Sequence, residues 1–175
     1  MFLFHNDYNE CCHPKVMEKM IEKQHVQMTS YGQDTCCDAA AAMIRNLCGD
    51  DQLAVHFLVG GTQANMTVIA AALRHHQGAV CADSGHINVH ETGAVEATGH
   101  KVLTCPSDDG KITAQQVRDT VLAHRADSSF EHMVQPKMVY ISNPSEYGTL
   151  YSKAELEALG ANELFEIYNE NRNRG

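Results

Sequence analysis

The residues best suited to chemistry in this sequence surround two consecutive glycines, Gly60 and Gly61. An apolar run, Leu53–Val59, precedes them and predicts a buried β-strand. The segment Thr62–Asn65 follows and opens a stretch to about His75 in which alanines and leucines have helical spacing. The first amides of such a helix lack partners and its dipole is positive there, so a bound phosphate is stabilised. The turn has neither the G-x-G-x-x-G nor the G-x-x-x-x-G-K-S/T spacing, and an ordinary strand-to-helix connection stays open as the alternative.

Histidines and cysteines offer a second chemistry, metal binding. Among the eleven histidines, His86 and His90 would share one face of a helix, but no H-E-x-x-H motif is present. The seven cysteines include adjacent pairs that begin at Cys11 and Cys36, which lack the C-x2-C spacing of zinc sites. An odd number of cysteines suits reduced thiols better than disulfides. We therefore expect no metal site, and a Cys/His metal protein, recognisable by stoichiometric zinc, stays as an alternative.

The elements that must position these residues alternate between strands and helices. Capping boxes at Thr113–Gln116 and Ser152–Glu155 predict two helix starts. Strands separated by helices indicate an α/β fold, a mainly parallel sheet with helices on both faces. Besides Leu53–Val59, the predicted strands are Ala79–Ala82, Lys101–Cys105 and Lys137–Ser142, and the predicted helices are Pro14–Lys23, Asp34–Leu47, Thr62–His75, Thr113–His124 and Ser152 to as far as Glu170.

Three polar segments follow predicted strands or lead into helices. In sheets of this kind ligands bind at the carboxyl ends of the strands. We therefore expect Gly60–Asn65, Ser84–His90 and Asn143–Gly148 to lie along one edge of the molecule.

Composition excludes several classes of function. With 43% apolar and 20% charged residues, the 175-residue chain has the make-up of a globular protein. A net charge of −9 without any Lys/Arg cluster argues against nucleic acid or an anionic membrane as partner. No apolar run approaches the roughly 20 residues that span a bilayer. The start, MFLFHNDYNE, lacks the basic flank of a secretory signal, so we expect a cytoplasmic protein.

Five segments carry a family resemblance: Tyr31–Asp34, Gly60–Asn65, Gly85–Ala94, Glu96–Lys101 and Tyr140–Asn143. In order and spacing they resemble the threonine aldolase and β-eliminating lyase family, over about residues 2–158. Its members are pyridoxal phosphate enzymes of the aspartate-aminotransferase fold, fold type I. The resemblance implies that residues 1–159 are the N-terminal part of that fold's large domain. It also implies pyridoxal 5′-phosphate as cofactor and a homo-oligomer with shared active sites.

The resemblance assigns roles to five residues around the expected cofactor. It implies that Gly61, Thr62 and Gln63 bind the phosphate, in agreement with the argument from the helix start. It implies that His86 stacks on the pyridine ring and takes part in proton transfer, which suits a flat ring that titrates near neutral pH. Glu91 matches the family's glutamate near the ring, which helps to orient His86 or the cofactor; a merely solvated or capping role is the alternative.

Three further residues match the family's substrate-binding positions. Asn6 and Asp7 occupy its Ser-Asp or Asn-Asp position, close to the substrate carboxylate. Tyr31 lies in the loop that, in the family, reaches the active site of the neighbouring subunit. For Asp7, as for Glu91, a solvated or capping role stays open.

The sequence departs from the family after Leu159. Relatives continue with a strand that ends in Asp-Gly-Ala-Arg, whose aspartate pairs with the pyridine nitrogen, and later with the lysine of the Schiff base. Residues 160–175 contain neither, and we expect them to form a divergent tail that is helical and then disordered. No lysine stands at the Schiff-base position among Lys101, Lys111, Lys137 and Lys153. We therefore expect a truncated domain with little or no aldolase activity by itself.

The reaction expected of full-length relatives is cleavage of a small β-hydroxy amino acid to glycine and an aldehyde. Two alternatives remain besides the metal protein. One is a β-eliminating lyase of another amino acid, which would release ammonia and a keto acid. The other is a non-catalytic fragment that binds phosphate or a homologous subunit.

Overall fold

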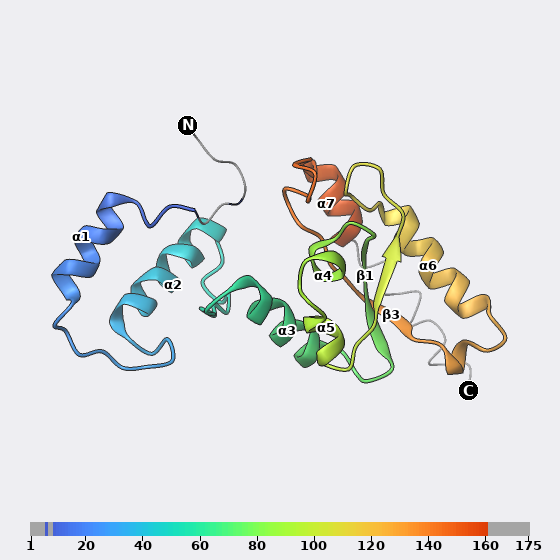
Figure 1. Ribbon diagram of the computed structural model, residues 1–175, viewed down its shortest axis with the longest axis horizontal. Helices are drawn as coiled ribbons and strands as arrows, with labels where there is room; N and C mark the ends of the chain where they lie inside the picture. The colour runs from blue at the N-terminus through green and yellow to red at the C-terminus, as the bar shows by residue number, and fades with distance from the viewer. Residues whose placement is uncertain (1–5, 7–8, 161–175) are drawn as a thin grey trace. The chain divides into compact units, whose positions relative to one another are not determined.

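The computed structural model describes residue 6 and residues 9–160, and the chain divides into two compact units, Met1–Phe57 and Leu58–Gly175 (Figure 1). The smaller unit contains the helices α1 (Pro14–Lys23) and α2 (Thr35–Cys48). Local residues determine the ends of α2, since Asp34 accepts hydrogen bonds from two amides of its first turn and Gly49 terminates it with a φ of 66°. Both helices were predicted to within one residue of these bounds.

The larger unit is built on a three-stranded parallel sheet with the order β2–β1–β3. The central strand β1 is paired on both sides, and all of its residues are buried because helices cover both faces (Figure 1). This arrangement confirms the predicted α/β class. The elements in chain order are α3 (Gly61–Ala72), β1 (Gln77–Ala82), α4 (His86–Val89), α5 (Ala94–Ala97), β2 (Val102–Cys105), α6 (Ala114–Ala126), the 3-10 turn η1 (Phe130–His132), β3 (Gln135–Val139) and α7 (Lys153–Gly160).

Two hydrophobic clusters hold helices against opposite faces of the sheet. The alternation of side chains along β1 sends Val80 and Ala82 into the cluster covered by α6 and α7, and Ala79 and Cys81 into the cluster covered by α3, α4 and α5. Burial raises the pKa of the Cys81 thiol to about 12, so the thiol stays protonated and acts as a core residue. The cluster around Ala79 and Cys81 holds α3, the helix that begins at the glycine pair, against the sheet.

The predicted strand at Leu53–Val59 is wrong. Within the described residues, no strand pairs with this run. Side chains form hydrogen bonds with its backbone groups instead. Arg45 donates through Nε to the Leu53 carbonyl at 2.8 Å, and the Val59 amide donates to Gln63 Oε1 at 2.9 Å. An apolar run becomes a strand only where a neighbour offers backbone hydrogen bonds.

The other predicted elements are present with shifted ends. Strand β3 begins two residues before the predicted Lys137 and ends at Val139. Both capping boxes form, at Thr113–Gln116 and at Ser152–Glu155. The predicted extension of the last helix toward Glu170, and the predicted tail beyond Gly160, lie outside the described residues. Among the described helices, none has the length and hydropathy that a bilayer span requires.

Candidate functional site

The start of α3 is an open, uncapped helix N-terminus. Its N-cap is Gly60, in an extended conformation, and no side chain of the described residues caps it. Gln63 uses its side chain to hold the preceding turn, through the bond from the Val59 amide. A Cβ added at Gly60 or Gly61 would meet no atom within 4 Å, so a ligand can approach this backbone. The arrangement fits an anionic group such as a phosphate.

A buried carboxylate lies against the first turns of α3. Asn65 donates through Nδ2 to Glu91 Oε1 at 2.7 Å, and this bond joins the glycine turn to the segment after α4. Glu91 is only 5% exposed, and its Oε2 has no hydrogen-bond partner within the part of the chain that the structure describes. An unpaired buried oxygen is costly, so a donor from a bound molecule would stabilise it. Glu91 thus contacts Asn65, and its role toward the cofactor stays a prediction.

His86 begins α4, just beyond the carboxyl end of β1. Gly85 makes this start possible, because a Cβ there would meet the Ala82 carbonyl at 2.9 Å. The His86 ring lies 3.0 Å, from Nδ1 to Oε1, from the carboxylate of Glu146. About 42% of the His86 side chain is exposed, which leaves a ring face accessible to a ligand. Its stacking and proton-transfer roles stay predictions.

Glu146 is a site residue that the sequence interpretation missed. It comes from the loop after β3 and reaches His86 across 60 positions of sequence. This contact joins Ser84–His90 to Asn143–Gly148, and the Asn65–Glu91 bond links Gly60–Asn65 to the residue directly after Ser84–His90. A signal was available, since an acidic residue in a Pro- and Gly-containing loop follows a predicted strand at the ligand-binding end.

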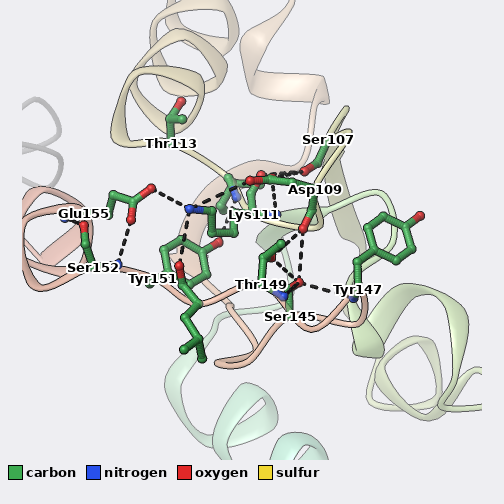
Figure 2. A network of polar contacts seen from close by, with 12 residues as sticks. Ser107, Asp109, Lys111, Thr113, Ser145, Tyr147, Thr149, Tyr151, Ser152 and Glu155 are labelled. Atoms are coloured by element: carbon green, nitrogen blue, oxygen red, sulfur yellow. Dashed lines mark hydrogen bonds and ion pairs between the residues drawn. The ribbon is translucent and has the colours of Figure 1, made fainter.

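A polar network fixes the loop that carries Glu146 (Figure 2). Its centre is Ser145, which is 6% exposed and donates through Oγ to the Asp109 carbonyl at 3.1 Å. Thr149 donates to the same carbonyl at 2.6 Å and contacts Ser145 Oγ. Gly110, with a φ of 80°, approaches so closely that an added Cβ would lie 2.8 Å from Ser145 Oγ. The turn around Asp109 therefore anchors the loop next to Glu146.

The same network continues to Lys111 and Glu155, whose charged groups lie 2.7 Å apart (Figure 2). The Lys111 ammonium also lies 5.5 Å from the centre of the Tyr151 ring, whose hydroxyl accepts a bond from the Ile112 amide. The hydrogen bond from Lys111, with further bonds from Ser152, lowers the pKa of Glu155 from 4.5 to about 2. The carboxylate correspondingly raises the pKa of Lys111.

Replacing Glu155 with glutamine should reduce the free energy of unfolding above about pH 5, and the difference should shrink as the pH falls toward 2. The folded pKa lies below the unfolded one, so the carboxylate stabilises the fold above 4.5, and this contribution is lost as Glu155 is protonated. Urea unfolding across this pH range measures the effect. Glu157→Gln is the control, because Glu157 pairs with Lys153 on an exposed helix face and should change little. An undiminished difference near pH 2 would contradict the assignment.

The predicted substrate residues belong to the smaller unit. Asn6 is exposed, and Asp7 lies outside the described residues. Tyr31 is 98% exposed and holds a φ of 62°, unusual for a tyrosine, in a turn closed by the bond from the Gln33 amide to the Ser30 carbonyl. A strained, exposed residue of this kind is a candidate for function, and its part in a substrate site stays a prediction.

Metal binding finds no support from the described side chains. Over residues 6 and 9–160, no three histidine, cysteine, aspartate or glutamate side chains gather in a way that could hold an ion. His86 and His90 both face the carboxylate of Glu146, but the His90 ring lies 3.9 Å, from Nε2 to Oε2, from it.

Similarity to known proteins covers most of the chain. Residues 12–162 match the family model described as beta-eliminating lyase. Low specificity L-threonine aldolases of Pseudomonas sp. (strain NCIMB 10558) and Pseudomonas aeruginosa are 30% identical over 158 residues, which is 89% of this chain and 44% of each relative. A solved threonine aldolase from Leishmania major matches with a TM-score of 0.85 and 42% identity, over 93% of this chain and 46% of that one. The chain spans less than half the length of these relatives, and the structural match confirms the predicted fold type I architecture.

Proposed function

Because this chain belongs to the beta-eliminating lyase family, we propose that it carries the cofactor cradle of a pyridoxal phosphate-dependent lyase. The proposed reaction cleaves a β-hydroxy amino acid of the threonine type to glycine and an aldehyde. The threonine aldolases among its relatives support this substrate class. A β-eliminating lyase of another amino acid is the second candidate, favoured by the breadth of the family description.

The observation that carries the proposal is the pair of hydrogen bonds Asn65–Glu91 and His86–Glu146. The first links the open helix start, which suits a phosphate, to the segment after α4, and the second holds an accessible imidazole at the carboxyl end of β1. Gly61, Thr62 and Gln63 would hold the phosphate through their amides. When bound, pyridoxal phosphate supplies an acceptor for the electrons released as the Cα–Cβ bond breaks.

His86 and Glu91 do different work in this proposal. The His86 ring offers a flat face to the aromatic cofactor and can take up or release a proton at Nε2, since Nδ1 faces Glu146. Glu91 offers its unpartnered Oε2 to a donor of the bound molecule and keeps α3 in place through Asn65.

We further propose that a polypeptide of residues 1–175 alone is not catalytically active. In the family, the aspartate of Asp-Gly-Ala-Arg and the lysine that holds the cofactor covalently follow the matched part. The lysines of this chain do not stand at that position, and Lys111 is engaged by Glu155.

Titrating that polypeptide with pyridoxal phosphate should give saturable binding that inorganic phosphate displaces. Borohydride treatment should not label a single lysine stoichiometrically, and threonine should yield no glycine above the rate in free cofactor. Absorbance, mass spectrometry and amino-acid analysis measure these three results. Absence of phosphate-sensitive binding would contradict the cradle, whereas turnover at ordinary enzyme rates would contradict the proposed inactivity. In any active preparation, ammonia and a keto acid as products would favour β-elimination.

Two further properties belong to the proposal. We propose a homo-oligomer with shared active sites, supported by exposed apolar side chains on the helices of the smaller unit, with light scattering as the test. These side chains are Val16, Met20, Ile21, Met43 and Leu47. We also propose a cytoplasmic location, which fractionation of cells that express the protein would test.

A further inference from the structure

We propose that Glu146 is a positioning residue for His86: its carboxylate holds the neutral imidazole in the Nδ1–H tautomer and leaves Nε2 as the proton acceptor. The catalytic meaning of this arrangement rests on the proposed function. The tautomer itself rests only on contacts within this chain.

The contact between the two side chains determines where the proton lies. His86 Nδ1 and Glu146 Oε1 are 3.0 Å apart, which is hydrogen-bond distance. An ionised carboxylate can only accept, so the shared hydrogen must belong to Nδ1. A neutral imidazole carries one ring hydrogen, and Nε2 therefore keeps a free lone pair.

Both partners stand on backbone that is held in place. His86 follows Gly85, which packs tightly against the end of β1. Glu146 follows Ser145, whose buried hydroxyl is bound to the Asp109 carbonyl and accepts bonds from the amides of Tyr147 and Thr149 (Figure 2). Because the backbone of each residue is held in place, the carboxylate and the ring lose less conformational entropy on pairing than two mobile surface groups would.

The carboxylate of the pair is partly shielded from water. The Glu146 side chain is 22% exposed, which limits the access of water to its oxygens. Ser142 lies near the same oxygen, with its Oγ 3.5 Å from Oε1. The carboxylate is thus a partly desolvated acceptor aimed at one ring nitrogen of His86.

His90 provides an internal comparison, because it faces the same carboxylate at longer range. Its Nε2 lies 3.9 Å from Glu146 Oε2, beyond hydrogen-bond distance, and its side chain is 59% exposed. The two rings have centroids 5.5 Å apart. If Glu146 acts by a hydrogen bond and not by its general charge, His86 will respond to its loss and His90 will not.

Nitrogen-15 NMR of the histidine side chains tests the inference on the protein without cofactor. In the native chain, neutral His86 should favour the Nδ1–H tautomer by at least about tenfold, as a charge-assisted bond predicts. In E146Q, whose amide can donate as well as accept, this preference should fall toward an even mixture. His86→Gln assigns the signal among the eleven histidines.

His90→Gln is the matched control and should leave the His86 tautomer unchanged. A native His86 in the Nε2–H form, or an E146Q spectrum like the native one, would overturn the inference. An equal response to H90Q and E146Q would overturn it as well. Backbone amide spectra check that both variants keep their fold.

Failure of this inference and failure of the proposed function give different results. If the tautomer is Nδ1–H but pyridoxal phosphate does not bind, the positioning holds and the cofactor proposal is wrong. If the cofactor binds while His86 shows no dependence on Glu146, the cofactor proposal stands and the positioning role is wrong.

Discussion

Thr62→Asp should weaken the binding of pyridoxal phosphate by at least about tenfold and leave the fold at least as stable as before. Thr62 is exposed in the first turn of α3, next to the glycine pair. A carboxylate there would repel a bound phosphate: two unit charges about 4 Å apart interact by about 4 kcal/mol near a protein surface, and about 1.4 kcal/mol already gives a factor of ten. Equilibrium titration with the cofactor measures the loss.

The same substitution separates binding from folding. An acidic residue in the first turn interacts favourably with the helix dipole, so thermal unfolding should occur at the same or a slightly higher temperature. Thr67→Asp adds an equal charge to an exposed position in the middle of the same helix and should change cofactor affinity much less. Equal losses in the two variants would show that overall charge, and not a phosphate at the helix start, governs binding.

Ile69→Ala should lower the free energy of unfolding of the larger unit by about 2–5 kcal/mol. Ile69 is 1% exposed and packs in the cluster that joins α3 to β1, α4 and α5. Removing its side chain leaves a cavity and loses contacts that the surrounding elements cannot fully replace. Urea unfolding followed by circular dichroism measures the change.

The neighbouring residue supplies the control for this prediction. Val68 is 55% exposed on the same helix, so Val68→Ala should change the free energy of unfolding by no more than about 0.5 kcal/mol. Similar decreases in the free energy of unfolding in both variants would mean that Ile69 does not hold α3 against the sheet. A loosened α3 should also weaken cofactor binding, because Asn65 and the glycine turn move with it.

Local features of the chain predicted many elements correctly. Asp34 and Gly49 bound α2, and the capping boxes at Thr113 and Ser152 begin α6 and α7, because each acts on amides only two or three residues away. The apolar run at Ala79–Ala82 became the central strand, since such a run suits a position buried on both faces. Helical spacing located the start of α3 to within one residue, since the helix was predicted from Thr62 and begins at Gly61.

Only the tertiary structure decided what depends on distant partners. Leu53–Val59 is as apolar as β1, yet it forms no strand, because pairing requires a neighbour that composition does not reveal. Glu91 meets Asn65 across 26 positions, and Glu146 meets His86 across 60. The sequence by itself determined which residues could do chemistry, since it contains the type of each side chain and the local spacing between them. Packing of the loops at the sheet edge decided which of them touch, and made Glu146 the partner of His86.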